Sequence, residues 1–293
     1  MTSPYVNRLV NSQESVDFRK AAGKTVVLTG GSSGLGLAYM QALIAAGAFV
    51  VNGDINPPSV AIPSDKGVFV KCDVSSWHEQ VNVFRRAKEK SPNGNIDVVI
   101  ANAGIYGPDT LDGLSDEEPT KPNTAILNVN LVGVIYTTRL AAWSFKKQGT
   151  LDPCIILITS IMGYIDTQGS SLYSAAKHGV RGLMTCLRRK QAIRVNCIAP
   201  WFIATPILKD SFVESTRRQF EAKGVDFALA EDAVSAVFRL VTDTSINGRT
   251  LGIVPRQLSS SGYMDLNHDD YNESDPLYNL QIVASTLVYD GVA

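Results

Sequence analysis

The sequence predicts a doubly wound α/β domain with a seven-stranded parallel sheet. Short runs rich in β-branched residues alternate with helical stretches along most of the chain, which is typical of consecutive βαβ units. The predicted strands are almost continuously apolar, so helices must cover both faces of the sheet. A glycine-rich turn separates the first strand from the first helix, at the edge where such sheets bind ligands.

Each element is identified by its residue pattern. The first strand reads TVVLT, and Gly47 ends the helix after it in the usual C′ role. Residues 77–90 form an amphipathic pattern, whereas prolines at 57, 58 and 63 disfavour a regular helix between the second and third strands. We expect strands at 25–29, 48–53, 68–72, 97–101, 155–159, 194–198 and 250–254, and helices at 35–46, 77–90, 122–147, 172–190 and 230–241.

These elements define one domain, residues 23–255, between two extensions. Residues 1–22 and 256–293 are polar, rich in Ser, Asn and Asp, and without clear periodicity, so either could be a flexible tail. An apolar pattern near the C-terminus nevertheless suggests that this end docks on another surface. The pattern consists of Leu280, Ile282, Val283, Leu287 and Val288.

The bulk composition argues against several classes of protein. With 27 basic and 28 acidic residues the net charge is -1, which gives no electrostatic case for nucleic acid or an anionic membrane. Apolar stretches reach about ten residues, against the roughly 20 of a membrane span, and the N-terminus lacks the apolar core of a secretory signal. The four cysteines form no CxxC pair and the three histidines lack metal-ligand spacing. We therefore expect a reduced, cytoplasmic protein without a metal.

The glycine-rich turn has the chemistry of a phosphate site. In Thr29–Gly36 (TGGSSGLG) the glycines follow a GxxxGxG spacing. Glycine permits a tight turn and a close approach of backbone to a pyrophosphate, and the helix N-terminus presents free N–H groups to it. A simple tight turn is the alternative, but the position directly after the first strand favours a nucleotide.

Asp54 predicts which nicotinamide dinucleotide such a site would prefer. It ends the second strand, 18 residues after Gly36. A carboxylate there can accept hydrogen bonds from both ribose hydroxyls and would repel a 2′-phosphate. Because no Arg or Lys lies in the turn or directly after Asp54, we expect NAD rather than NADP.

Three further residues suggest acid–base chemistry. Tyr173 and Lys177 are four apart on a predicted helix and so share one face. A neighbouring ammonium is expected to lower the phenol pKa from about 10, so that Tyr173 exchanges a proton with a hydroxyl or carbonyl. Ser160, at the end of the fifth strand, can donate to the same oxygen. A Tyr-x-x-x-Lys pair alone is more often an ordinary surface pair; Ser160 and the glycine turn together favour catalysis.

In this order the motifs resemble those of the short-chain dehydrogenase/reductase family over residues 23–255. The family's Asn-Ala-Gly motif matches 102–104, its adenine-contacting aspartate matches Asp73, and the Ser-to-Tyr spacing of 13 is usual. The resemblance implies a Rossmann-type fold and hydride transfer between a nicotinamide cofactor and a secondary alcohol or ketone. It implies the catalytic residues Ser160, Tyr173, Lys177 and Asn130, and the cofactor-binding residues Gly30, Ser32, Ser33, Gly34, Leu35, Gly36, Asp54, Ile55, Cys72, Asp73, Val74, Asn102, Ala103, Gly104, Tyr173, Lys177, Pro200, Trp201, Ile203 and Thr205.

The segment after the sixth strand departs from the family pattern. Trp201 stands where the family usually has glycine, and tryptophan is costly at a position that requires φ > 0. An aromatic wall of the site and a core-packing residue are equally good interpretations. Residues 206–224 should form the substrate-covering loop and helix, and their apolar side chains suggest a hydrophobic or aromatic substrate. The implied substrate contacts are Ser160, Met162, Tyr173, Trp201, Phe202 and Phe212.

The Pro-Trp turn and the polar C-terminus also resemble fungal members of the family. Those members are similar to 15-hydroxyprostaglandin dehydrogenase and to hydroxyaverantin-type dehydrogenases, which implies alcohol oxidation in secondary metabolism. The family usually forms dimers or tetramers, so we expect a homodimer or homotetramer. Three alternatives stay open: an NADP-dependent ketone reductase, a non-redox isomerase, lyase or cyclase, and a nucleotide-sensing binding protein.

Overall fold

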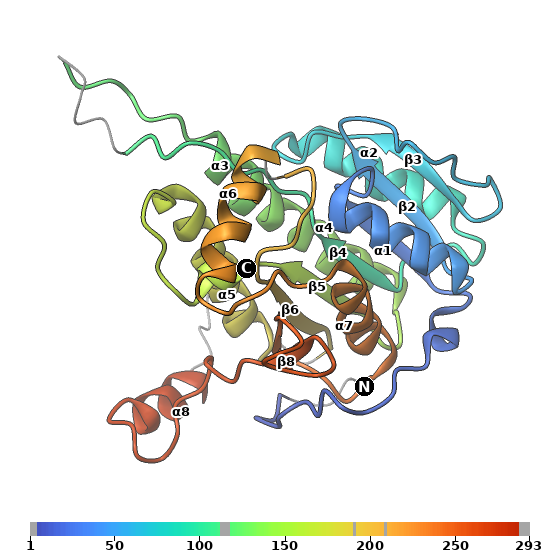
Figure 1. Cartoon of the computed structure of the whole chain (residues 1–293). Coiled ribbons are helices and arrows are strands. Elements are labelled where there is room, and N and C mark those ends of the chain that lie inside the picture. Colours follow the sequence, from blue (N-terminus) through green and yellow to red (C-terminus); the bar gives the residue numbers. More distant parts are fainter. Residues whose placement is uncertain (1–4, 112–117, 190–191, 208–209, 287–293) are drawn as a thin grey trace.

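The computed structural model describes residues 5–111, 118–189, 192–207 and 210–286. One sheet lies between two layers of helices (Figure 1). The strand order is β3-β2-β1-β4-β5-β6-β7-β8. Seven strands are parallel, as predicted, and β8 pairs with β7 in the antiparallel direction. The strands are β1 (Thr25–Thr29), β2 (Phe49–Asp54), β3 (Gly67–Lys71), β4 (Val98–Ala101), β5 (Cys154–Ile158), β6 (Arg194–Pro200), β7 (Thr250–Ile253) and β8 (Tyr263–Asp265).

The helices divide between the two faces of the sheet. Alternate residues of β1 enter two separate cores: Val26 and Leu28 pack with α1 and α7, and Val27 packs with α2, α4 and α5. This two-sided burial explains why the strands are continuously apolar. The helices are η1 (Phe18–Ala21), α1 (Gly34–Ala45), α2 (Trp77–Lys90), α3 (Ala125–Leu127), the π-helical turn η2 (Asn128–Val132), α4 (Gly133–Gln148), η3 (Ile161–Gly163), α5 (Ser171–Leu187), α6 (Asp210–Glu221), α7 (Ala230–Thr242) and α8 (Tyr278–Thr286).

The winding direction reverses between β1 and β4. From β1 the chain continues to β2 and β3 on one side, and then returns to β4, β5, β6 and β7 on the other. The loops that follow β1 and β4 lead to opposite sides of the sheet, so a crevice forms between them at the carboxyl ends of the strands. The sequence-predicted glycine turn lies at this point.

The segment predicted as a C-terminal extension contributes the eighth strand. Tyr263 of β8 is buried, and Asp265 forms two hydrogen bonds with Arg249, at 2.7 and 2.8 Å. Further along, Leu280 and Ile282 on α8 are exposed, and α8 lies apart from the body in Figure 1. The structure therefore does not bury these two residues, and the predicted docking residues Leu287 and Val288 lie outside the described part of the chain.

Within the described part of the chain, one continuous helix is long and apolar enough to cross a membrane by length and composition alone. It comprises α3, η2 and α4, Ala125–Gln148. Its buried side chains, among them Val134, Leu140 and Phe145, belong to the core between the sheet and α2. This packing accounts for part of its apolar character, whereas Ile135 and Trp143 on the same helix are exposed.

Candidate active site

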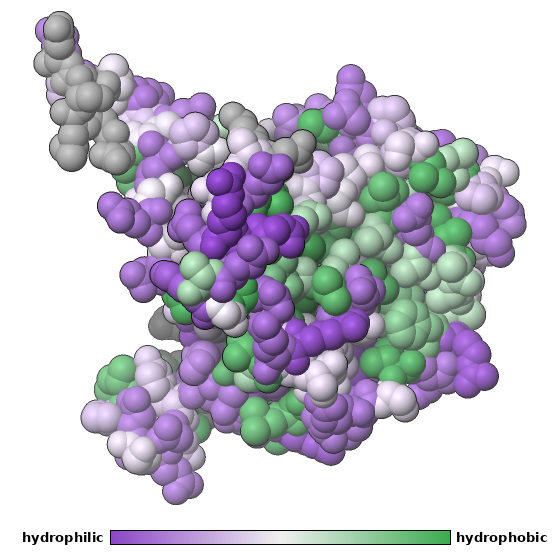
Figure 2. Space-filling view, in the orientation of Figure 1, coloured by the Kyte–Doolittle hydropathy of each residue, from purple (hydrophilic) through white to green (hydrophobic). Residues whose placement is uncertain are grey.

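A cleft with a volume of about 610 Å³ runs along the carboxyl ends of β1 to β6. Figure 2 shows hydrophilic residues over the outer face of α6 and apolar residues in the hollow beside it. The cleft brings the sequence-predicted site residues together with three exceptions. Ser32 and Asn130 do not line it, and the side chain of Phe212 lies outside the described part of the structure.

The glycine turn at one end of the cleft fits a pyrophosphate. Gly30 and Gly34 have positive φ, +69° and +52°, which other residues rarely adopt. A Cβ on Gly36 would lie 2.0 Å from the Gly30 carbonyl oxygen, so only glycine allows helix and turn to meet here. Ser33 begins α1 without a side-chain cap, and the first turn carries no acidic residue. The N–H groups of α1 are thus left for an anion.

Two carboxylates lie beyond the turn, where the ends of β2 and β3 border the cleft. Asp54 Oδ2 accepts a hydrogen bond from the Ser32 backbone N–H at 2.9 Å, so the acid is held against the turn. Asp73 follows β3 and accepts from the backbone N–H of Ser75 at 2.9 Å. Ser32 does not line the cleft, and its hydroxyl donates to the Asn56 carbonyl oxygen at 2.6 Å, so its role toward a cofactor stays a prediction.

The Asn-Ala-Gly motif ties β4 to the glycine turn. The Asn102 amide donates to the carbonyl oxygens of Thr29 and Gly30, at 2.9 and 3.0 Å. Ala103 packs so closely that its Cα would lie 2.7 Å from a Cβ on Gly30. These contacts fix the floor of the cleft, which explains why small residues occur at this position.

Ser160, Tyr173 and Lys177 converge in the middle of the cleft. Ser160 lies two residues after the end of β5, at the N-cap position of η3, where its hydroxyl accepts from the Met162 N–H at 3.2 Å. Tyr173 and Lys177 lie on the first two turns of α5. The Lys177 ammonium donates to the Ile158 carbonyl oxygen at 3.0 Å and lies 5.5 Å from the centre of the Tyr173 ring.

Burial sets the protonation states of these groups. Burial raises the pKa of Tyr173 to about 12, although a hydrogen bond from Ser160 partly opposes the rise. Burial also lowers the pKa of Lys177 from 10.5 to about 8. The prediction that Lys177 lowers the pKa of Tyr173 is therefore wrong for this structure, because loss of water dominates. At neutral pH the phenol is protonated and the ammonium is still charged.

Asn130 supports the cleft from behind. It is fully buried in the π-helical turn η2. Its side-chain amide accepts a hydrogen bond from the Ile105 N–H and donates one to the Ile105 carbonyl oxygen, each at 2.8 Å. This pair fixes the loop after β4, including Gly104, where a Cβ would lie 3.8 Å from the Lys177 nitrogen. In this structure Asn130 holds the loop beside Lys177; its predicted catalytic role stays a prediction.

Trp201 combines the two interpretations that the sequence leaves open. It lines the cleft, and it also stacks on Phe220 of α6, with ring centres 5.3 Å apart. The ring of Phe202 contacts the Trp201 ring edge-on, with centres 5.1 Å apart. The Trp201 indole N–H donates to the Asp226 carbonyl oxygen at 3.1 Å. Among the described non-glycine residues only Ala192 and Asn267 have positive φ, so the anticipated backbone cost does not arise at Trp201.

Sequence reasoning missed Tyr106. Its ring meets Tyr173 edge-on at 5.2 Å, and its hydroxyl lies 2.9 Å from the Ser170 hydroxyl. The only signal in the sequence is an aromatic residue two positions after the Asn-Ala-Gly motif. Other lining residues that sequence reasoning missed are Gly53, Asn56, Ile105, Val129, Ile158 and Thr159, whereas Pro206 and Ile207 belong to the predicted substrate loop.

Comparisons with known proteins agree with this geometry. A family model described as short chain dehydrogenase matches residues 24–216. The chain is 35% identical over 286 residues to 5'-hydroxyaverantin dehydrogenase of Dothistroma septosporum, covering 87% of this chain and 90% of that one. It is 28% identical to NADP-dependent dehydrogenase M3 of a Phoma species, covering 86% and 81%. Ligand-free aldohexose dehydrogenase of Thermoplasma acidophilum shares the fold, with a TM-score of 0.70, 24% identity, and coverage of 81% and 94%.

Proposed function

Since this chain belongs to the short chain dehydrogenase family, whose members act on alcohol groups with a nicotinamide cofactor, we propose that it oxidises a hydrophobic secondary alcohol with NAD. The convergence of Ser160, Tyr173 and Lys177 in one cleft carries the proposal. The relative named 5'-hydroxyaverantin dehydrogenase supports a substrate from secondary metabolism.

The side chains divide the work at the substrate oxygen. When bound, the nicotinamide supplies the hydride acceptor for the alcohol carbon. The Ser160 hydroxyl donates a hydrogen bond to the substrate oxygen and stabilises charge on it. The Tyr173 hydroxyl oxygen exchanges the proton with that oxygen. Lys177, whose ammonium lies 5.5 Å from the centre of the Tyr173 ring, would hold the cofactor ribose.

The preference for NAD rests on charge at the adenosine end. Asp54 and Asp73 lie at the adenosine end of the cleft. Among the described residues that line the cleft, the only cation is Lys177, at the catalytic centre. A 2′-phosphate about 4 Å from a carboxylate would be repelled by about 1 kcal/mol in water and by about 4 kcal/mol at an effective dielectric near 20. We therefore propose at least about tenfold tighter binding of NADH than of NADPH. Two relatives are named NADP-dependent dehydrogenases, so tighter binding of NADPH than of NADH is the outcome that would contradict this proposal.

The substrate side of the cleft supports an apolar alcohol. Met162 is buried beside Ser160, and Trp201, Phe202 and Ile207 border the same space. None of these groups offers a charge to a sugar acid or phosphate. An aromatic or lipophilic substrate would bury its surface against them.

The test combines cofactor binding with product counting. Purified protein is titrated with NADH and NADPH, and then incubated with NAD and a series of hydrophobic secondary alcohols. We expect tighter NADH binding and one NADH formed per ketone. Product without NADH would indicate an isomerase, lyase or cyclase, tighter NADPH binding would indicate a ketone reductase, and binding without turnover would indicate a nucleotide sensor.

We also propose that the protein acts as a homodimer or homotetramer. Ile135 and Trp143 on α4 are exposed in the single chain, which supports an apolar contact between copies. Light scattering after gel filtration gives the mass; a monomer at the protein concentration of the assay would refute the proposal.

A further inference from the structure

The C-terminal segment after β8 reaches the elements that carry the catalytic residues. Asp269 is 5% exposed and accepts a hydrogen bond from Arg181 of α5 at 2.6 Å through Oδ1. Its Oδ2 accepts from the Tyr164 hydroxyl at 3.0 Å and from the Thr250 hydroxyl at 3.1 Å. One buried carboxylate thus joins α5, β7 and the loop that follows Ser160.

Arg181 links the same loop to the catalytic helix. It lies one turn after Lys177 on α5 and donates to the Gly163 carbonyl oxygen at 3.3 Å. Its guanidinium stacks over the Tyr164 ring at 4.1 Å and also donates to the His268 carbonyl oxygen. The side chain is 25% exposed, and Asp269 is its one carboxylate partner among the described residues.

The loop held in this way is the one that positions Ser160. Gly163 N–H donates to the Ser160 carbonyl oxygen at 2.9 Å. A Cβ on Gly163 would lie 3.0 Å from the Lys177 carbonyl oxygen, and the Thr159 hydroxyl donates to that oxygen at 2.8 Å. Movement of η3 therefore changes the distance between Ser160 and the Tyr173–Lys177 face of α5.

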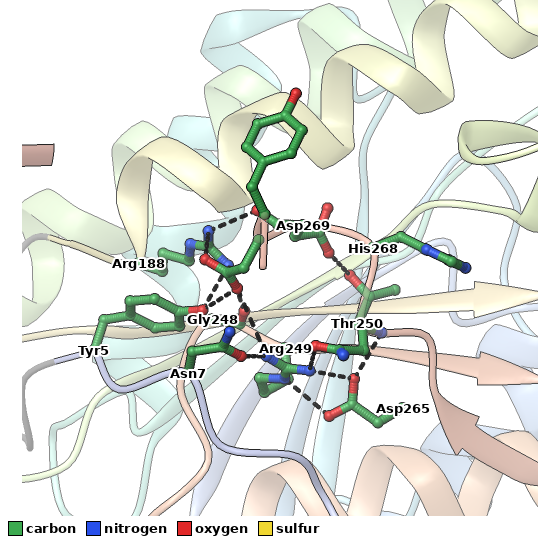
Figure 3. Close-up of polar contacts among 12 residues, drawn as sticks. Tyr5, Asn7, Arg188, Gly248, Arg249, Thr250, Asp265, His268 and Asp269 are labelled. Carbon is green, nitrogen blue, oxygen red and sulfur yellow. Dashed lines mark hydrogen bonds and ion pairs between the residues drawn. The ribbon is translucent and has the colours of Figure 1, made fainter. Parts of the chain in front are cut away.

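The segment itself is fixed independently of the cleft. Figure 3 shows the two chain ends meeting at Arg188 and Arg249, with Tyr5 and Asn7 on one side and Asp265 on the other. Arg188 is 1% exposed and donates to Asp270 at 2.8 Å, directly after Asp269 in the chain. Asp269 is thus attached to a rigid support rather than to a free tail.

We propose that Asp269 is a positioning residue for catalysis, acting through Arg181 and Tyr164 on the loop that carries Ser160. The inference rests on the proposed dehydrogenase function and deepens it: the C-terminal extension becomes part of the machinery of the same site. Displacement of a catalytic group by about 1 Å reduces turnover about 100-fold in enzymes. We therefore expect removal of the Asp269 charge to reduce kcat about 10- to 100-fold while cofactor binding is retained.

The experiment compares Asp269→Asn with Asp265→Asn. Asp265 is a matched control because it is equally buried, 4% exposed, is also paired with an arginine, Arg249, and lies in the same extension. Its contacts are with Arg249, the Val10 N–H and the Asn267 N–H, and none of the described ones reaches η3 or α5. Both variants should lower the thermal midpoint, but only Asp269→Asn should lower kcat at a temperature where both are folded, with the Kd for NADH within about twofold of wild type.

A double-mutant cycle tests whether the effect passes through Arg181. Arg181→Met keeps an apolar stem over the Tyr164 ring and removes the ion pair. Because the ion pair with Asp269 is what Arg181 contributes, the double variant should lose no more kcat than Asp269→Asn alone. Additive losses would overturn the proposal, as would a kcat for Asp269→Asn equal to that of Asp265→Asn. Arg181→Met also gives the result if Asp269→Asn does not fold.

Amide hydrogen exchange separates this inference from the proposed function. In Asp269→Asn, residues 161–165 should exchange faster than in wild type, while in Asp265→Asn they should not. If wild type oxidises no alcohol, the proposed function fails, yet the exchange comparison still decides whether Asp269 holds the loop. Unchanged exchange in that loop would overturn the positioning role even in an active dehydrogenase.

Discussion

Replacement of Lys177 by methionine should stabilise the protein while abolishing its chemistry. Lys177 is almost fully buried, and burial lowers its pKa from 10.5 to about 8. Each pKa unit corresponds to about 1.4 kcal/mol, so the charged side chain destabilises the folded state by about 3 kcal/mol. Methionine has a similar length and needs no water. It leaves the Ile158 carbonyl oxygen without its 3.0 Å donor, which costs about 1 kcal/mol. The net gain should be about 2 kcal/mol.

The stability that Lys177→Met gains over wild type should decrease as pH rises. Below about pH 8 lysine is charged in both the folded and unfolded states, so wild type carries the whole cost of burying the charge. Between pH 8 and 10.5 folded Lys177 loses its proton while unfolded Lys177 retains it, and the cost falls steadily as pH rises. Above pH 10.5 both states are neutral and the methionine variant has lost its charge-related advantage.

Urea denaturation of the Lys177→Met variant and wild type at pH 7 and pH 10 measures this difference. Lys146→Met is the control, because Lys146 is exposed on α4 and its replacement should change the free energy of unfolding by less than about 0.5 kcal/mol. A Lys177→Met variant that is less stable than wild type at pH 7 would refute the reasoning. So would a difference that does not narrow between the two pH values.

Three other variants, with Gly182→Ala as a control, probe the cleft and the loop that supports it. Gly36→Ala places a Cβ 2.0 Å from the Gly30 carbonyl oxygen and should weaken NADH binding more than about tenfold. In the control, Gly182→Ala, the Cβ meets nothing within 4 Å, and the variant should stabilise α5 by up to about 1 kcal/mol. If calorimetry and NADH titration found the same change in stability and in NADH affinity for both variants, the close contact at Gly36 would not matter. Asp54→Asn should improve NADPH binding at least about tenfold, and an unchanged NADH/NADPH ratio would remove the charge argument. Asn130→Ala removes two buried hydrogen bonds to the loop after β4 and should lower the free energy of unfolding by about 2 kcal/mol; a smaller loss than about 0.5 kcal/mol in urea would show that the loop is held otherwise.

The sequence predicted the parallel sheet because its signals are local and strong. The first strand and the glycine turn depend on apolar continuity and on glycine spacing, both visible in a short window. β8 has only three residues, Tyr263–Asp265, in a polar context, and it pairs because Asp265 meets buried Arg249. Arg249 lies outside this segment, so the residue pattern of the segment alone does not predict a strand.

The convergence of the proposed catalytic residues was predictable from spacing, but their pKa values were not. An i, i+4 relation places Tyr173 and Lys177 on one face of α5, as observed. It does not indicate how much water the fold removes from the phenol, and this burial raises the pKa of Tyr173 instead of lowering it. The contribution of Tyr106 to the same site depends on the path of a loop, which residue spacing does not encode.

We propose Tyr173 as the proton-exchanging group of an NAD-dependent alcohol dehydrogenase. The most direct test is the rate of NADH formation in a single turnover of Tyr173→Phe, with NADH affinity measured on the same preparation. We predict a rate at least about 100-fold below wild type with affinity within about twofold, because only the hydroxyl is removed. Turnover close to the wild-type rate, with the variant binding NADH normally, would contradict the claim.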